Sequence, residues 1–278
     1  MQIGIFAKTF PRPTLEGVLD AVISHGLRCV QFNLACAGLP SMPDQIAPDM
    51  ASRIRSATAD REITIAALSG TFNMIHPDLE IRRDGLRRLR ELASVCGRLG
   101  TSVISLCTGS RDAEDMWRHH PENSSAEAWR DLVVSIREAL SFAAEYDLTL
   151  AIEPETNNVV NSARKARRLL DEMATSRLKI IIDPANLFRV GELSRMKEVF
   201  DDAFELLGGD IVIAHAKDFV EEDGAIRHVA AGRGTLDYDY YATWLRKINF
   251  DGAMILHGLV EEEISGCLTF LQRNVAAP

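Results

Sequence analysis

The chain has 278 residues and a formal net charge of −9, which opposes non-specific attraction to nucleic acid or anionic membranes. No apolar run approaches the roughly 20 residues that a membrane-spanning helix needs, and the first residues have the pattern of a strand, not of a signal peptide. Hydrophobic residues make up 46% of the chain, enough for a large core without disulfides. We therefore expect neither a nucleic-acid partner nor a membrane partner.

The five cysteines are widely spaced and form no Cys-x-x-Cys pair. An odd, scattered set of cysteines is typical of reduced thiols and not of a disulfide framework. We therefore expect a cytoplasmic protein. Four cysteines fall in apolar segments and are predicted to lie in the core: Cys29, Cys96, Cys107 and Cys267.

Short apolar segments rich in Val and Ile recur along the chain and alternate with amphipathic helices. They are apolar on both faces, which favours parallel strands covered on both sides. Eight successive strand–helix units without a linker predict one (β/α)₈ TIM barrel, with residues 1–278 as a single domain. The predicted strands are residues 3–6, 29–32, 63–68, 103–107, 148–152, 178–182, 211–214 and 253–256.

An open, doubly wound sheet is the alternative fold. Its first strand would normally lead into a phosphate-binding glycine loop. Here the first strand is followed by Ala-Lys-Thr-Phe-Pro at residues 7–11, without that motif. The longest irregular segments, residues 35–48 and 109–125, both follow strands and would overhang the catalytic face of a barrel.

Four successive predicted strands end in a residue that can bind a metal ion. Glu153 follows the fifth strand, Asp183 the sixth, His215 the seventh and His257 the eighth. The carboxyl ends of barrel strands converge on one mouth, where an unpaired buried carboxylate or imidazole is poorly solvated. Carboxylate oxygens and imidazole nitrogens suit Mn²⁺, Zn²⁺, Co²⁺ or Mg²⁺. We therefore predict one divalent metal ion at this mouth.

The same segments resemble a known superfamily. The blocks Ala-Ile-Glu-Pro-Glu, Ile-Asp-Pro-Ala-Asn, Ala-His-Ala-Lys-Asp and Ala-Gly-Arg-Gly-Thr-Leu-Asp-Tyr are similar to those of the xylose-isomerase-like sugar (phosphate) isomerase/epimerase superfamily. That superfamily also contains hydroxypyruvate isomerases, ketose 3-epimerases, inosose dehydratases and endonuclease IV. The resemblance implies a metal ion held by Glu153, Asp183 and His215.

The chain departs from the epimerase pattern at two positions. The epimerases have a second glutamate at the end of the eighth strand, which completes the metal site and serves as one of two acid/base carboxylates, whereas this chain has His257 there. They also often have a histidine three residues after the strand-six aspartate, whereas this chain has Asn186. We predict His257 as the fourth ligand and, with Glu153, as a catalytic group.

Other polar residues are expected around the mouth. Alternation along the seventh strand places Lys217 on the same side as His215, so Lys217 is a candidate for catalysis and for substrate binding. An ion pair with Asp218 or Glu155 is the alternative role for Lys217. The remaining candidate substrate contacts are Asn73, His76, Glu155 and Asn186, and Gly232 and Gly234 are expected either beneath the substrate or in a tight turn.

These observations predict a metal-dependent isomerase or epimerase of a small sugar, sugar phosphate or keto acid. Glu153 would remove a proton beside the carbonyl group while the metal stabilises the enediolate, and His257, Glu155 or water would return it. The expected partner is a small polyhydroxy carbonyl substrate, and a homo-oligomer is left open. The alternatives are a dehydratase, an endonuclease IV-like metal-dependent phosphodiesterase, and a non-catalytic sugar-binding barrel, which the absent strand-eight glutamate would suit.

Overall fold

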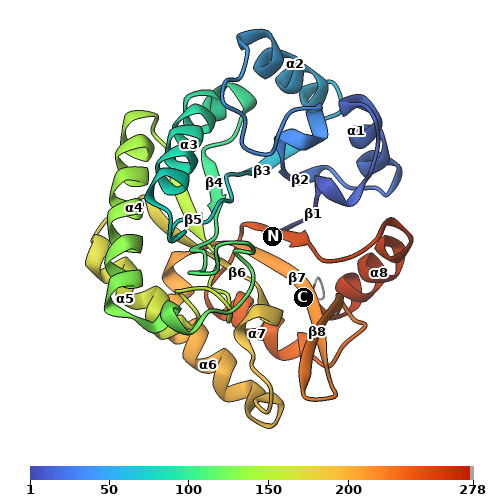
Figure 1. Cartoon of the computed structure of the whole chain (residues 1–278). Coiled ribbons are helices and arrows are strands. Elements are labelled where there is room, and N and C mark those ends of the chain that lie inside the picture. Colours follow the sequence, from blue (N-terminus) through green and yellow to red (C-terminus); the bar gives the residue numbers. More distant parts are fainter. Residues whose placement is uncertain (276–278) are drawn as a thin grey trace.

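A closed ring of parallel strands forms the centre of the computed structural model, which describes residues 1–275 (Figure 1). Each strand pairs with the next, and β9 pairs with both β7 and β1, which closes the ring. The predicted (β/α)₈ barrel is thereby confirmed. The ring strands are β1 (Gln2–Phe6), β2 (Cys29–Phe32), β3 (Thr64–Ser69), β4 (Val103–Leu106), β5 (Thr149–Ile152), β6 (Leu178–Ile182), β7 (Ile211–Glu222) and β9 (Ala253–Leu256).

The α-helices form the outer layer around the strands (Figure 1). Polar side chains before several of them accept a hydrogen bond from a first-turn N–H group, as Thr14 and Ser125 do, which satisfies donors that the helix itself leaves unpaired. In residues 1–275, no helix is both long and apolar enough to cross a membrane. The helices are α1 (Leu15–Ser24), α2 (Pro48–Ala59), α3 (Leu79–Leu99), α4 (Ala126–Glu145), α5 (Ala163–Met173), α6 (Met196–Leu207), α7 (Tyr238–Lys247) and α8 (Ile264–Asn274).

A small apolar cluster formed by alternate residues of the ring strands is separate from the large core between strands and helices. Ile181, Ile213 and Ile255 belong to this cluster, and each is at most 2% exposed. Because strand side chains alternate between faces, the residue two positions further on lies on the same face, nearer the carboxyl end. The residues two positions after these isoleucines are Asp183, His215 and His257. In the same way, Glu153 follows Ala151 and Gln31 follows Cys29.

Strand β7 continues beyond the predicted apolar segment at residues 211–214 and beyond the ring. It continues to Glu222, turns at Asp223 and Gly224 and returns as β8 (Ala225–Ala230), antiparallel to it. Both turn residues have positive φ, 51° and 72°, as a two-residue hairpin turn of the right twist requires. The outer end of β7 is not covered on both faces, and the outer half of the strand is therefore polar. That half lacks the continuous apolar pattern of the ring strands.

Asp218 of β7 ties the segment that follows the hairpin to the barrel. It is 1% exposed, and its carboxylate accepts hydrogen bonds from the N–H groups of Phe219, Gly232, Gly234 and Leu236 at 2.8 to 3.2 Å. A Cβ atom on Gly234 would overlap the Asp218 carboxylate. The two glycines therefore form a tight turn around Asp218, the second of the two roles expected for them.

Replacing this carboxylate should destabilise the fold. Asp218→Ala leaves the buried N–H donors without an acceptor, so we expect the free energy of unfolding to fall by about 2–4 kcal/mol. Asp218→Asn keeps the shape and one acceptor oxygen and should lose less. Urea denaturation followed by circular dichroism measures both variants, and a change below about 0.5 kcal/mol in Asp218→Ala would contradict the structural role.

Candidate metal and catalytic site

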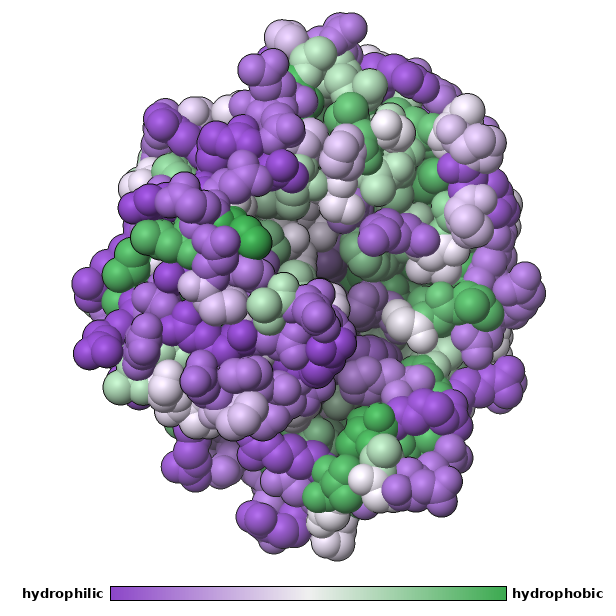
Figure 2. All heavy atoms as spheres, viewed as in Figure 1, coloured by the Kyte–Doolittle hydropathy of each residue, from purple (hydrophilic) through white to green (hydrophobic). Residues whose placement is uncertain are grey.

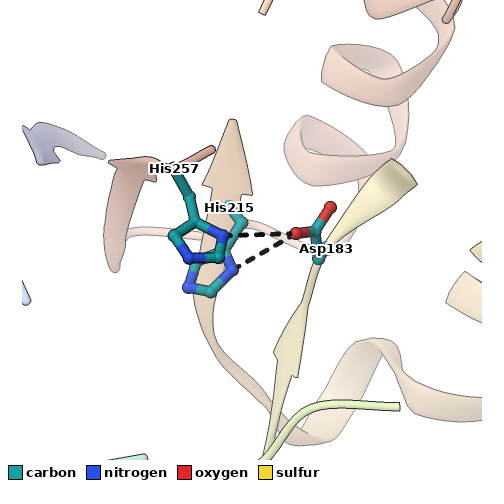
Figure 3. Close-up of side chains that lie close together, drawn as sticks. All are labelled: Asp183, His215 and His257. Carbon is teal, nitrogen blue, oxygen red and sulfur yellow. Dashed lines mark ion pairs between the residues drawn. The ribbon is translucent and has the colours of Figure 1, made fainter. Parts of the chain in front are cut away.

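Three buried atoms at the carboxyl end of the ring face one another and have no hydrogen-bond partner within residues 1–275 (Figure 3). They are Oδ2 of Asp183 and the Nδ1 atoms of His215 and His257. The oxygen lies 3.5 Å from the nitrogen of His215 and 3.8 Å from that of His257. Ligands of a tetrahedral zinc ion would lie about 3.4 Å apart, so a divalent ion fits among these atoms.

Glu153 lies beside this cluster, next to His215, and is not among the three residues whose donor atoms all lie within 4.8 Å of one another. Its Oε2 lies 3.6 Å from His215 Nδ1, and its Oε1 accepts a 2.6 Å hydrogen bond from the side-chain amide of Asn186. One oxygen is thus held in place while the other faces the cluster. The two carboxylates and two imidazoles together form a set that suits zinc, manganese or cobalt.

Gln31, which the sequence analysis missed, orients the ring of His215. The Gln31 amide nitrogen donates to Ser105 Oγ at 3.2 Å, and its oxygen lies 3.0 Å from His215 Nε2. That oxygen can only accept, so in the neutral ring Nε2 of His215 carries the hydrogen and Nδ1 presents its lone pair to the cluster. The available signal was a single polar residue inside a strand whose residues are all buried.

Lys217 lies beside the cluster, on the same face of β7 as His215. Its Nζ is 3.6 Å from Asp183 Oδ2 and donates to Asn186 Oδ1 at 3.2 Å. The expected alternative, an ion pair with Asp218 or Glu155, is replaced by this contact with Asp183. Burial lowers the pKa of Lys217, but the neighbouring carboxylates outweigh it and raise the pKa above its usual value. The side chain is therefore a cation at neutral pH.

The buried charges at the site shift one another's pKa values. Burial alone would raise the pKa of Asp183, but the charge of Lys217 and the two nearby imidazole rings hold it well below its usual range. Burial lowers the pKa of His257 and favours its neutral ring. Burial also lowers the pKa of His215, but the neighbouring carboxylates of Glu153 and Asp183 outweigh the burial and raise the pKa of His215 to about 9. A proton and a metal ion thus compete for His215 Nδ1.

Glu155 is half-buried two residues beyond Glu153. Burial and the charge of the Glu153 carboxylate raise the pKa of Glu155 to about 8. At neutral pH its carboxyl group is therefore protonated in the metal-free protein and can donate a hydrogen bond, which an ionised carboxylate cannot do.

The structure does not bring Asn73 and His76 to this cluster. The Asn73 amide donates to the carbonyl of Ser110 at 2.8 Å and accepts from its N–H at 3.1 Å. The His76 ring contacts the carbonyl of Ala113 through Nε2 and the N–H of Asp78 through Nδ1. These contacts connect the loop after β3 to the irregular segment after β4, so they favour anchoring over the substrate binding that we had predicted.

Comparison with known families agrees with the architecture of the barrel. A family model described as a xylose isomerase-like TIM barrel matches residues 19–264. The chain belongs to this family. No curated protein sequence gives a significant match, so evidence about individual relatives comes from solved structures.

Solved structures of this family superimpose over nearly the whole chain. The 3-keto-D-glucoside 4-epimerase YcjR of E. coli is 16% identical, with a TM-score of 0.74 over 98% of this chain and 99% of its own. The IolI protein with a bound zinc atom is 16% identical, with a TM-score of 0.75 over 99% and 98%. The probable 3-DHS dehydratase AsbF of Bacillus anthracis is 14% identical, with a TM-score of 0.75 over 98% and 99%. At these identities the likeness concerns the fold alone.

Proposed function

We propose that this protein is a metal-dependent isomerase or epimerase of a small polyhydroxy carbonyl compound. The observation that carries the proposal is the convergence of unpartnered atoms of Asp183, His215 and His257, with Glu153 beside them. Buried polar atoms without partners are costly and rare, and a divalent ion would satisfy all of them at once. A sugar epimerase and a zinc-bound protein among the similar structures support the same reading.

Glu153 is the residue best placed to accept a proton from substrate carbon. A divalent ion at the cluster would supply Lewis acidity toward two adjacent substrate oxygens. The Asn186 amide holds one oxygen of Glu153 at 2.6 Å, and the other oxygen faces the cluster. This fixed orientation favours proton transfer, because a positioned base avoids the cost of reorganisation.

Lys217 and Glu155 would complete the chemistry. The Lys217 ammonium group, held by Asn186 and Asp183, would stabilise negative charge as it develops on a substrate oxygen. Glu155 is our candidate for returning the proton, because His257 directs its Nδ1 at Asp183 Oδ2 and is better placed as a ligand. This assignment gives the chain two carboxyl groups for acid/base work despite the absent strand-eight glutamate.

Hydrogen exchange at carbon tests this proposal. The metal-loaded protein is incubated in D₂O with a panel of ketoses, inososes and short keto acids, and deuterium incorporation beside the carbonyl group is followed by NMR. Incorporation into at least one compound, with about one metal ion per chain, is the expected result. About three ions would instead favour the phosphodiesterase alternative, and none would favour the sugar-binding barrel.

Removing the metal should separate activity from folding. Chelation is expected to abolish exchange and to lower the melting temperature, because the buried carboxylates and rings lose their shared partner, while the circular dichroism spectrum keeps its shape. Adding Mn²⁺, Zn²⁺ or Co²⁺ back should restore exchange. Equal exchange before and after exhaustive chelation would rule out metal dependence.

A further inference from the structure

Figure 2 shows a face of the molecule that is hollowed near its centre. A cavity of about 520 Å³ opens on the hairpin side of the barrel mouth. Its walls come from the loops after β4, β5 and β6 and from strand β8. The residues that matter here are His119, Asn157, Asn161, Phe188, Arg189 and His228.

The walls of this cavity continue from the residues of the candidate site. Phe188 follows Asn186 by two residues, and its ring lies 5.2 Å from the ring of Phe219. Phe219 lies two residues beyond Lys217 and pairs with His228 of β8. Paired residues of antiparallel strands point to the same face, so His228 and Lys217 share one side of the hairpin. Two residues along a strand span about 7 Å, so one small substrate could reach both Lys217 and the cavity wall at His228.

Arg189 gives the cavity a positive charge. Its guanidinium group donates to the carbonyl of Asn161 at 2.9 Å and forms no ion pair within residues 1–275. Two nearby carboxylates accept from backbone groups of the same loop: Glu192 from the Arg189 N–H at 2.8 Å, and Glu221 from the Gly191 N–H at 3.0 Å. These contacts fix the loop that carries Arg189 against the hairpin.

The other polar groups of the cavity are available to a ligand. In the described part of the chain, the side chains of His119, Asn157 and His228 make no hydrogen bond, and no carboxylate lines the cavity. Imidazole and amide groups both offer N–H donors. In a chain with a net charge of −9, this cavity offers a cation and several donors, and no acidic residue lines it.

We propose that this cavity is a subsite for an anionic group, a carboxylate or phosphoryl group at the far end of the substrate, with Arg189 as its main contact. A guanidinium group matches two oxygens of either anion at once, and the neighbouring amide and imidazole groups supply the remaining donors. The proposal deepens the proposed function and rests on it for the reaction at the other end of the substrate.

Calorimetric titration with three matched probes tests the subsite: D-ribose 5-phosphate, D-ribonate and D-ribose. In the metal-loaded protein, at least one anionic probe should bind more tightly than ribose. Arg189→Gln should weaken binding of that anion roughly tenfold and leave ribose unchanged. Arg98→Gln is the matched control, since Arg98 is exposed in the last turn of α3, at the opposite end of the barrel, and its variant should bind all probes as the wild type does.

The binding outcomes test the anion subsite, and deuterium exchange tests the reaction separately. Tighter binding of the phosphate probe identifies a phosphoryl site, and tighter binding of ribonate identifies a carboxylate site. Equal binding of all three probes, no binding of either anion, or equal losses in Arg189→Gln and Arg98→Gln would overturn the proposal. Binding that depends on Arg189 without deuterium exchange in any compound would keep the subsite and refute the proposed isomerase or epimerase.

Discussion

Asp183→Asn is expected to abolish carbon–hydrogen exchange and to weaken metal binding by more than about 100-fold, beyond the loss typical of residues that only orient a ligand. The reason is geometric: Oδ2 of Asp183 lies within 3.8 Å of both His215 Nδ1 and His257 Nδ1. The asparagine keeps the shape but removes the charge that a divalent ion needs. Calorimetry with Zn²⁺ or Mn²⁺ and metal content after dialysis measure the metal binding, and D₂O exchange measures the activity.

Asp210→Asn is the matched control for the loss of a paired carboxylate. Asp210 precedes β7 at the other end of the barrel and pairs with Lys179 at 2.6 Å and Arg167 at 2.8 Å. Its variant should lose some stability but retain full metal content and exchange. An Asp183→Asn protein with the wild-type metal content would show that the ion, if any, binds elsewhere.

The ring of strands could be predicted because burial on both faces leaves a simple pattern. A ring strand such as β6, Leu-Lys-Ile-Ile-Ile, is buried at nearly every residue, and continuous apolar runs that alternate with helical periodicity fit few folds besides a barrel or a doubly wound sheet. The β7–β8 hairpin had no such pattern, since its outer residues are exposed in part. The Asp-Gly pair at residues 223–224 was the local signal for its turn.

The strand-end donors could be predicted for a related reason. Alternation places Asp183 and His215 above interior apolar residues, so their place in the sequence nearly determines their place in the barrel. The contact between Gln31 and His215 could not be predicted, because it joins strands far apart in the sequence across the interior of the ring. The hydrogen bonds between the Asn73 amide and the backbone of Ser110 could not be predicted either, because they join two loops far apart in the sequence.

His257 is the position at which this chain differs most from the epimerases it resembles, and its variants should have large and distinct effects. His257→Ala should weaken metal binding by at least about 10-fold, the smallest loss typical of residues that only orient a ligand. His257→Glu should restore much of that affinity, because a carboxylate can replace the imidazole as a donor. Calorimetric metal titration of both variants measures these changes, and Phe6→Leu, which alters only the ring packed 5.5 Å from His257, is the control for local packing.

The rate should not follow the metal affinity in the His257→Glu variant. In the wild type, Glu153 and Asp183 balance the charge of a divalent ion, and a neutral imidazole adds none. A third carboxylate would lower the net charge of the site by one unit, weaken the Lewis acidity of the ion and disfavour a substrate that carries an anionic group. We therefore expect His257→Glu to bind metal well and yet to exchange an anionic substrate at least about tenfold more slowly than wild type, by the cost of one unfavourable nearby charge. Wild-type metal affinity and full exchange in His257→Ala would show that His257 is not part of the metal site. An unchanged exchange rate in His257→Glu would show that the lack of charge on His257 has no role in the choice of substrate.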